Sequence, residues 1–390
     1  MLNTGLVSIF NYLFWLTAGR AITPASIGMV TEAISAAALI VALTRLGMDD
    51  SLTRFLPGSK DPAGFYNALI AIILVITSVT SVGFLLGLEY ISPALTFLNN
   101  WQYSLLFYGY VFLTSICDMQ GTALVAIRRA DLAFLQYGIL IFRIPLLLAM
   151  KSFGVIGVFL ALDIAYLITF AAGVALLYKK SVARDLHVNI GEALSTIRFS
   201  LGNYTSTVMY TAGLMLLPIM IVNVSGSAQA AYFYIAFTVA TFLFMVPESV
   251  AASMFVEGSH NRPLRETTIK ALIFNWMLLA PMVLAVFVFG EPILRLVSPE
   301  YSAAAYQLLL LLALSSLFYA VMTVYVTVVQ VQKNMLALNL MRFIWSGLIL
   351  VLGYIMLSRA GLIGVGYAWL LGNVGVCAIV GWRMVREKKW

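Results

Sequence analysis

The sequence predicts an all-α integral membrane protein with twelve transmembrane helices. Composition is the first observation, because 62% of the 390 residues are hydrophobic and only 10% are charged, with a mean hydropathy of +0.98. Average soluble domains carry about 25% charged residues. The second observation is that apolar runs of about 20 residues, each long enough to cross a ~30 Å hydrocarbon core, recur along the whole chain. Lipid is therefore the expected solvent of this fold, and membrane lipids are its first expected partners.

The apolar runs are expected to be helices, because a span in lipid must satisfy its own backbone hydrogen bonds. The predicted spans lie near 3–19, 26–45, 65–88, 103–127, 131–150, 154–178, 199–222, 229–256, 266–290, 303–329, 334–357 and 362–384.

The basic residues predict the orientation, because Lys and Arg accumulate in cytoplasmic loops. Seventeen of the 23 follow even-numbered spans and four follow odd-numbered spans, while Arg143 and Arg342 lie inside spans. Both termini are therefore predicted in the cytoplasm, with the chain in the cytoplasmic membrane. The net charge of +7 is mostly this orientation signal, and no nucleic-acid partner is expected.

The two halves of the chain resemble one another. Residues 154–158 and 361–365 both read Gly-x-Ile-Gly-Val, one of several matches at an offset near 200 residues. Six spans is an even number, so both halves enter the membrane in the same sense and are related by an axis along the membrane normal. We expect two parallel-related six-helix lobes, 1–178 and 199–390, around a central cavity, joined by a cytoplasmic linker, 179–198. This is the plan of a transporter.

The residues of common enzyme and metal motifs are scarce. Cys117 and Cys377 both lie inside predicted spans, so we expect no disulfide framework and no thiolate metal site. No HExxH, CxxC or phosphate-binding GxxxxGK[ST] motif occurs. The sequence therefore predicts no metal, no cofactor and no enzymatic activity.

The junction 47–57 interrupts the apolar run 27–44 and is expected to be a loop on one membrane face. The pattern LG-D-S--RFLP that starts at Leu46 resembles the exit of the second helix in polysaccharide (O-antigen type) flippases of the multidrug/oligosaccharidyl-lipid/polysaccharide exporter superfamily. Residues 11–15 and the turn 24–28 follow the opening order of that family, with Ser26 where the family usually has an acidic residue.

This resemblance implies a flippase for surface polysaccharide biosynthesis. It implies export of a polyprenyl-diphosphate-linked oligosaccharide by alternating access. A lipid-linked anionic oligosaccharide is the expected substrate, and H⁺ or Na⁺ is the expected coupling ion.

Charged residues inside spans are the candidate site residues, because a charge at a helix centre costs roughly 2.5–3.5 kcal/mol. Such groups are expected to face a wet cavity or to pair with each other. Six residues meet this criterion: Glu32, Asp118, Arg143, Asp163, Glu248 and Arg342.

The predicted substrate-binding residues are Arg143, Asp163 and Arg342. Arg143 lies about 10 Å and Asp163 about 13 Å from the outer ends of consecutive antiparallel spans, so both are expected at one level. Two interpretations stay open, namely an Arg143–Asp163 ion pair, and an Arg143 that faces the cavity and binds an anionic headgroup. Arg342 lies in the counterpart of the span that carries Arg143, and one arginine in each lobe suits a diphosphate or an acidic sugar. Snorkelling of Arg342 to the cytoplasmic face is its alternative.

The predicted coupling-ion or gate residues are four. Glu32 in the second span is a candidate site for a coupling cation or proton. Asp118 and Glu248 lie towards the cytoplasmic ends of their spans, where contacts with a gate or loop are expected. Arg54 belongs to the 47–57 junction and is either a gate residue or an ordinary orientation charge.

Other functions stay open beside the flippase. A cation-coupled multidrug antiporter of the same superfamily has the same fold, and it is expected to use carboxylates more than arginines. A membrane polysaccharide polymerase or ligase needs a sizeable extracytoplasmic loop or a His/Asp cluster, but the longest predicted outer connection, 89–102, holds Glu89 and no histidine. A scaffold without transport activity is a further alternative.

Overall fold

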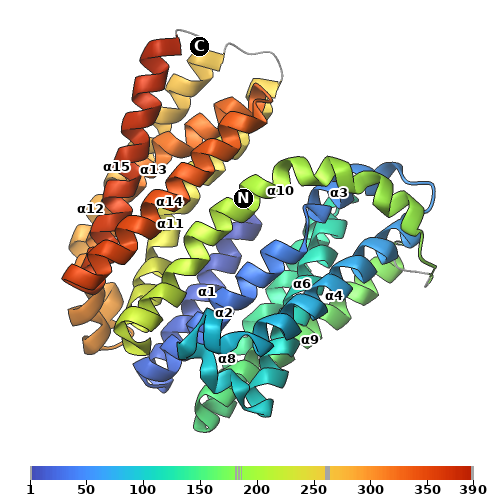
Figure 1. Ribbon diagram of the computed structural model, residues 1–390, viewed down its shortest axis with the longest axis horizontal. Coiled ribbons are helices and arrows are strands. Elements are labelled where there is room, and N and C mark those ends of the chain that lie inside the picture. Colours follow the sequence, from blue (N-terminus) through green and yellow to red (C-terminus); the bar gives the residue numbers. More distant parts are fainter. Residues whose placement is uncertain (1, 181, 183–184, 186, 260–263, 388–390) are drawn as a thin grey trace. The chain divides into compact units, whose positions relative to one another are not determined.

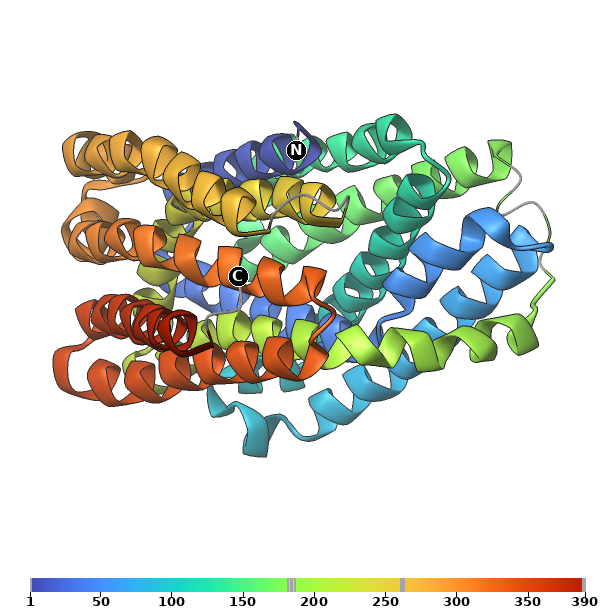
Figure 2. The ribbon, with the colours of Figure 1, turned by 90° about the horizontal axis from the view of Figure 1, so that it is seen from above.

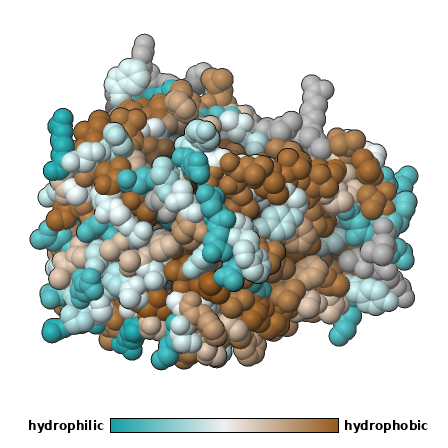
Figure 3. Space-filling view, turned by 60° about the horizontal axis from the view of Figure 1, so that its bottom comes forward, coloured by the Kyte–Doolittle hydropathy of each residue, from teal (hydrophilic) through white to brown (hydrophobic). Residues whose placement is uncertain are grey.

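A computed structural model describes residues 2–180, 182, 185, 187–259 and 264–387. Within these ranges the chain is helical and has no strand, which confirms the predicted all-α class. Nine helical segments of this part are long and apolar enough to cross a membrane, and one of them, 130–179, contains two successive passes. Apolar side chains cover much of the face seen in Figure 3. The chain is therefore a multi-pass membrane protein.

The chain forms two compact units. The N-unit is Ala21–Thr211, and the C-unit is Met1–Arg20 with Ala212–Trp390. This division groups the first helix with the C-terminal helices, whereas the sequence predicts it in the lobe 1–178. The predicted lobe boundaries therefore stay a prediction.

The N-unit consists of helices that are colored blue to green in Figure 1. Its elements are α2 (Pro24–Thr44), α3 (Met48–Phe55), η1 (Leu56–Gly58), α4 (Pro62–Leu86), α5 (Leu88–Ile91), η2 (Pro93–Asn99), α6 (Trp101–Ala126), α7 (Ala130–Gly138), η3 (Ile139–Phe142), α8 (Arg143–Met150), η4 (Lys151–Phe153), α9 (Gly154–Lys179) and the first part of α10 (Ile190–Ser225). Helix α6 is central, because it packs against α2, α3, α4, α7 and α9.

The C-unit contains the remaining helical segments, and Figure 2 shows its last four helices side by side, in orange to red. Its elements are α1 (Leu2–Ala21), the second part of α10, α11 (Ser227–Ser259), α12 (Leu264–Arg295), α13 (Pro299–Val331), α14 (Met335–Ala360) and α15 (Leu362–Glu387). Helix α13 packs against α11, α12 and α15. Each of the twelve predicted spans coincides with a helical segment of the described chain, with α7 to α8 as the fifth.

Part of the predicted linker 179–198 is helical. Helix α10 begins at Ile190, so residues 190–198 are continuous with the seventh span. Residues 181, 183, 184 and 186 of the linker lie outside the described part.

Three long helices begin in the same way, with a polar cap followed by proline. The side chains of Thr23, Asp61 and Ser298 accept hydrogen bonds from the backbone N–H three residues on. Proline follows each cap at the first helical position, where its fixed φ fits and its missing N–H costs nothing. These starts fix where α2, α4 and α13 begin.

The junction 47–57 is a helix rather than the predicted loop. Helix α3 carries Asp49 and Asp50 in its first turn and Arg54 in its last, the charge order that a helix dipole favours. Met48 and Leu52 lie four residues apart on one face and are fully buried in the core of the N-unit. The charges that marked a loop in the sequence therefore form the polar face of an amphipathic helix.

The fifth span is interrupted, although the sequence predicts it as one helix. Helix α7 ends at Gly138, the 3₁₀ turn η3 follows, and α8 begins at Arg143. Its predicted counterpart, α14, is continuous over Met335–Ala360. A stretch of 3₁₀ helix inside a span often marks a hinge or a strained sequence.

The internal repeat is visible in the turns. Helices α6 and α13 both end in a Schellman motif with a non-glycine residue of positive φ, Arg128 (φ 60°) and Lys333 (φ 57°). Helix α9 begins at Gly154 (φ 58°, ψ −129°) and α15 directly follows Gly361 (φ 63°, ψ −149°), so a glycine of similar conformation lies at the start of each. The same backbone therefore recurs at two corresponding turns of the two halves, as the repeat predicts.

Aromatic side chains fill the interior of the C-unit. The Trp369 ring lies 5.3 Å from that of Phe237 and 5.8 Å from that of Trp345, and the Tyr319 ring lies 5.2 Å from that of Phe244. Trp345 donates its indole N–H to Oδ1 of Asn373 at 3.0 Å. This packing joins α11, α13, α14 and α15.

Candidate functional site

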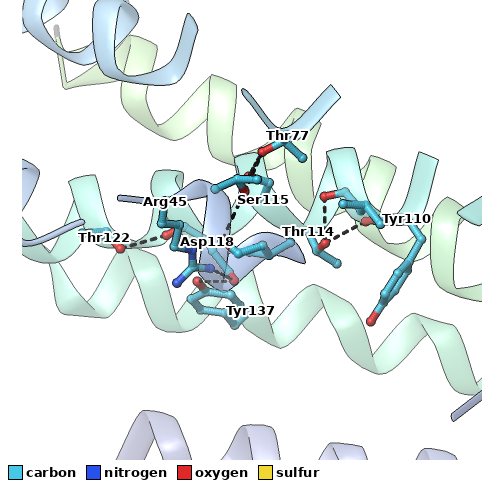
Figure 4. A network of polar contacts seen from close by, with 11 residues as sticks. Arg45, Thr77, Tyr110, Thr114, Ser115, Asp118, Thr122 and Tyr137 are labelled. Carbon is cyan, nitrogen blue, oxygen red and sulfur yellow. Dashed lines mark hydrogen bonds and ion pairs between the residues drawn. The ribbon is translucent and has the colours of Figure 1, made fainter. Parts of the chain in front are cut away.

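An ion pair lies between the second and fourth spans of the chain, both of which belong to the N-unit. Arg45 follows the last residue of α2, and its guanidinium contacts the carboxylate of Asp118 on α6. Tyr137 on α7 donates a hydrogen bond to the other carboxylate oxygen at 3.3 Å. Figure 4 shows the three side chains converging. Gly121 leaves room for the Tyr137 hydroxyl, because a Cβ there would lie 2.5 Å from it.

A pocket of about 250 Å³ opens beside this ion pair. It is bounded by α2, α3, α6 and α10, and its polar lining consists of Arg45, Asp49, Asp50, Asp118, Tyr204, Thr207 and Thr211. Three carboxylates and one guanidinium give this lining a formal charge of −2. The pocket is therefore chemically suited to a cationic or hydroxyl-rich group and unsuited to a diphosphate.

Arg143 is the buried cation of the fifth span. Its side chain is 7% exposed, and it lies at the first position of α8, directly after the η3 turn. It follows the start of α7 by 13 residues, which is about 20 Å at helical rise. The break in the helix and the buried guanidinium thus coincide near the middle of the span.

Asp163 faces α6 rather than Arg143. Its Oδ2 atom lies 3.7 Å from the position that a Cβ on Gly109 would take, and its Oδ1 atom is buried without a hydrogen-bond partner. No ion pair among the described residues joins Arg143 to Asp163. The structure therefore does not bring these two predicted site residues into an ion pair.

Glu32 is fully buried in the middle of α2. Its Oε1 atom accepts a hydrogen bond of 2.7 Å from the hydroxyl of Ser92, and its Oε2 atom is buried without a partner. Ser92 lies between α5 and η2, in the connection of α4 with α6. The structure thus places this candidate coupling residue against a connection between spans.

The two candidate residues of the C-unit lie on different helices. Arg342 is half-buried on α14, seven residues after its start, so it lies about 9 Å nearer to that end of its span than Arg143 does. Glu248 is exposed on α11 and accepts a hydrogen bond from the Tyr319 hydroxyl on α13. The two arginines therefore occupy corresponding helices but not corresponding levels.

Arg54, the remaining candidate, is exposed on α3. Its guanidinium carbon lies 5.6 Å from the ring centroid of Phe55. It does not line the pocket beside Arg45.

Sequence reasoning missed Arg45, Tyr137 and Ser92. Arg45 was counted among the orientation charges because it directly follows an apolar run. Its signal is that Asp118 lies eight residues, about 12 Å, before the end of α6, so that the carboxylate needs a cation reaching into the membrane. Tyr137 and Ser92 carry no such signal.

Comparison with known proteins gives a likeness in structure alone. No protein-family model matches the chain, and no curated protein matches it in sequence. The lipid II flippase MurJ in an inward closed conformation is similar over 98% of this chain and 86% of its own, with a TM-score of 0.79 and 13% identity. An inward-facing MATE family transporter of the MOP superfamily is similar over 97% of this chain and 94% of its own (TM-score 0.72, 15% identity). The MATE multidrug transporter DinF-BH is similar over 99% of this chain and 93% of its own (TM-score 0.65, 15% identity).

These likenesses extend over nearly the full length of this chain and of the solved structures. At 13–15% identity they concern the arrangement of helices and not the side chains. The chain has the all-helical membrane fold of these solved transporters.

Proposed function

We propose that the protein is a membrane transporter that flips a polyprenyl-diphosphate-linked oligosaccharide across the cytoplasmic membrane by alternating access, for surface polysaccharide biosynthesis. The observation that carries the proposal is Arg143, a buried guanidinium at the interruption of the fifth span. Discontinuous spans near the bilayer middle are where transporters bind their substrates. A guanidinium presents a planar fork of donors that matches a diphosphate.

The other predicted residues have supporting roles in this proposal. Arg342 is a further oxyanion-binding residue on the counterpart helix, and Asp163 accepts hydrogen bonds from sugar hydroxyls or from Arg143 in another state. Asp118 with Arg45, and Glu248 with Tyr319, act as gate contacts that break during the cycle, and Arg54 guides anionic substrate at the predicted cytoplasmic face. Glu32 binds the coupling ion.

Binding of undecaprenyl diphosphate to the purified protein tests the role of Arg143. We expect this lipid to raise the unfolding temperature, whereas undecaprenol, which has the same tail without the diphosphate, leaves it unchanged. Arg143→Ala removes a charge-assisted contact of about 1.5–3 kcal/mol, so affinity falls on the order of 10–100-fold. Arg143→Lys keeps the charge but lacks the planar fork of donors. Its affinity is expected to lie between that of Arg143→Ala and that of the unchanged protein.

Arg359→Ala is the matched control, because Arg359 is an exposed arginine near the end of α14. Arg359→Ala removes the same charge, and this variant is expected to bind undecaprenyl diphosphate with the affinity of the unchanged protein. Equal affinity of Arg143→Ala and Arg359→Ala would refute the role given to Arg143.

A cation-coupled multidrug antiporter is the second candidate, and the pocket beside Arg45 favours it. Asp49 and Asp50 bring excess negative charge to that pocket, which suits a cationic drug. The test measures stabilisation of the purified protein by ethidium, a cationic dye. Stabilisation that is lost in Asp49→Asn with Asp50→Asn, without any response to undecaprenyl diphosphate, would favour this function over the flippase.

A further inference from the structure

The connection between α4 and α6 folds back over the N-unit. We call residues 87–100 the strap. Ser92, Leu95 and Leu98 of the strap are fully buried, and η2 packs against both α2 and α6. Tyr90, in contrast, is 93% exposed. The strap therefore has one face sealed against the helices and one face open, and the orientation predicted from the basic residues places it on the outer side.

Glu32 contacts the strap through Ser92. The Ser92 hydroxyl donates to Oε1 of Glu32 at 2.7 Å, and both side chains are fully buried. The second carboxyl oxygen is buried without a partner, and no ion pair of the described residues includes Glu32. A buried carboxyl group with one donor is accommodated as the neutral acid, because an ionised one needs further donors or a paired cation.

The neighbouring elements offer few charges to Glu32. The titratable side chains on α4, α6 and α9, which pack against α2, are Tyr66, Tyr103, Tyr108, Tyr110, Cys117, Asp118, Asp163, Tyr166, Tyr178 and Lys179. The turn η2 has none, and α5 carries the exposed Glu89 and Tyr90. Helix α10 contacts the other end of α2, where the Tyr204 hydroxyl donates to the carbonyl oxygen of Leu43. Asp118 is paired with Arg45. Asp163 lies nine residues after the start of α9 and Glu32 lies eight residues after the start of α2, so both are at a similar distance from those helix ends. Asp163 is itself a half-buried carboxyl group and therefore supplies no cation to Glu32.

We propose that Glu32 is a proton-binding site that keeps the strap closed over the outer end of the N-unit. With a proton bound, the neutral carboxyl group stays buried and Ser92 remains attached. When the proton leaves, the carboxylate draws in water, Ser92 is released, and Leu95 and Leu98 leave their buried positions. This inference rests on the proposed transport function, and it names a proton as the coupling ion and the strap as the gate that the proton controls.

Accessibility of residue 95 from outside intact cells tests the proposal. Leu95→Cys is made in a Cys117→Ala, Cys377→Ala background and labelled with a membrane-impermeant maleimide over a range of pH. The labelling rate is divided at each pH by that of Tyr90→Cys in the same background, which corrects for the reactivity of the reagent. We expect Leu95→Cys to be protected at acid pH and its relative rate to rise at least tenfold at alkaline pH.

Substitutions at Glu32 and Ser92 separate the proton from a merely structural contact. Glu32→Gln keeps an oxygen that accepts the Ser92 hydrogen bond and has no proton to lose, so Leu95→Cys is expected to stay protected at every pH. Ser92→Ala and Glu32→Ala remove the contact and are expected to leave position 95 labelled at every pH. Ser92→Ala is the milder of the two, and gel filtration checks that each variant is folded.

Three results would overturn the proposal. The first is equal labelling of positions 95 and 90 at acid pH with Glu32 and Ser92 intact. The second is a pH response that persists in Glu32→Gln, and the third is a Tyr90→Cys that is not labelled from outside. None of these measurements involves a substrate. A result that overturns the strap proposal is therefore distinguishable from a result that overturns the proposed function, which is that undecaprenyl diphosphate does not bind.

Discussion

Among single residues, Arg45 and Asp118 form a contact whose removal has a predictable cost. Their side chains are 24% and 37% exposed, so water screens the pair only in part. Breaking a fully buried pair costs about 3–5 kcal/mol, and an exposed pair contributes at most about 1 kcal/mol. This pair belongs between these limits.

Arg45→Gln is expected to lower the free energy of unfolding by about 1–3 kcal/mol, because Asp118 then keeps its charge after losing its cation. Asp118→Asn in addition is expected to restore much of this loss, since it removes the uncompensated charge. Thermal unfolding in detergent measures both variants. A double variant that is less stable than Arg45→Gln alone would contradict this assignment.

Single residues also show where prediction from sequence ends. Hydropathy identifies Asp118 and Glu32 as costly, because the depth of a charge in the membrane depends on its place along a span. Their partners depend on which helices touch and on how each is rotated. Arg45 lies 73 residues from Asp118 and Ser92 lies 60 residues from Glu32, so neither pairing follows from local sequence.

Among the structural elements, the interruption of the fifth span is the feature most closely tied to the proposed function. Gly138 precedes the η3 turn and has a helical φ of −58°, and a Cβ added there would meet nothing within 4 Å. Alanine is therefore tolerated at this position and favours helix over glycine by about 0.5–1 kcal/mol.

Gly138→Ala is expected to stiffen the junction of α7 and α8, to raise the unfolding temperature and to slow transport of undecaprenyl diphosphate-linked sugar in proteoliposomes. Gly347→Ala is the matched control, because Gly347 lies inside the continuous α14 and a Cβ there also meets nothing within 4 Å. The control is expected to gain similar stability with unchanged transport. Equal transport by the two variants would show that the interruption does not need to flex.

The elements themselves were largely predictable, since apolar length alone locates a span. The exceptions have local physical causes. Helix α3 was hidden because its Met48 and Leu52 are too few to register as an apolar run, and its buried face appears only when it packs on the core. The η3 turn itself reads Ile-Leu-Ile-Phe, but its signal follows directly in the sequence. Pro145 has no N–H to donate to the carbonyl of Ile141 four residues before it, and its ring crowds that carbonyl.

At the scale of the whole molecule, two corresponding turns have the similar backbone that an internal duplication predicts. The Gly-x-Ile-Gly-Val repeat predicted this duplication. A Cβ on the second glycine of either motif, Gly157 or Gly364, would overlap a carbonyl oxygen of the preceding helical segment, that of Met150 or Met356. The first glycine of each motif therefore allows the chain to reverse with a positive φ, and the second allows two backbone segments to approach closely.

The two corresponding turns give a paired prediction. Because their backbone conformations are similar, the same substitution is expected to destabilise each of them by a similar free energy. Gly154 and Gly361 combine φ near +60° with strongly negative ψ, a conformation that alanine adopts at a cost of about 1–3 kcal/mol. Gly154→Ala and Gly361→Ala are each expected to lower the unfolding temperature, by about 2–4 °C for each kcal/mol if the unfolding unit has 150–250 residues. Gly58→Ala is the control, since a Cβ on Gly58 meets nothing within 4 Å and no positive φ occurs there. If only one of the two substitutions lowered the unfolding temperature, the two halves would share a sequence pattern without sharing its contribution to stability.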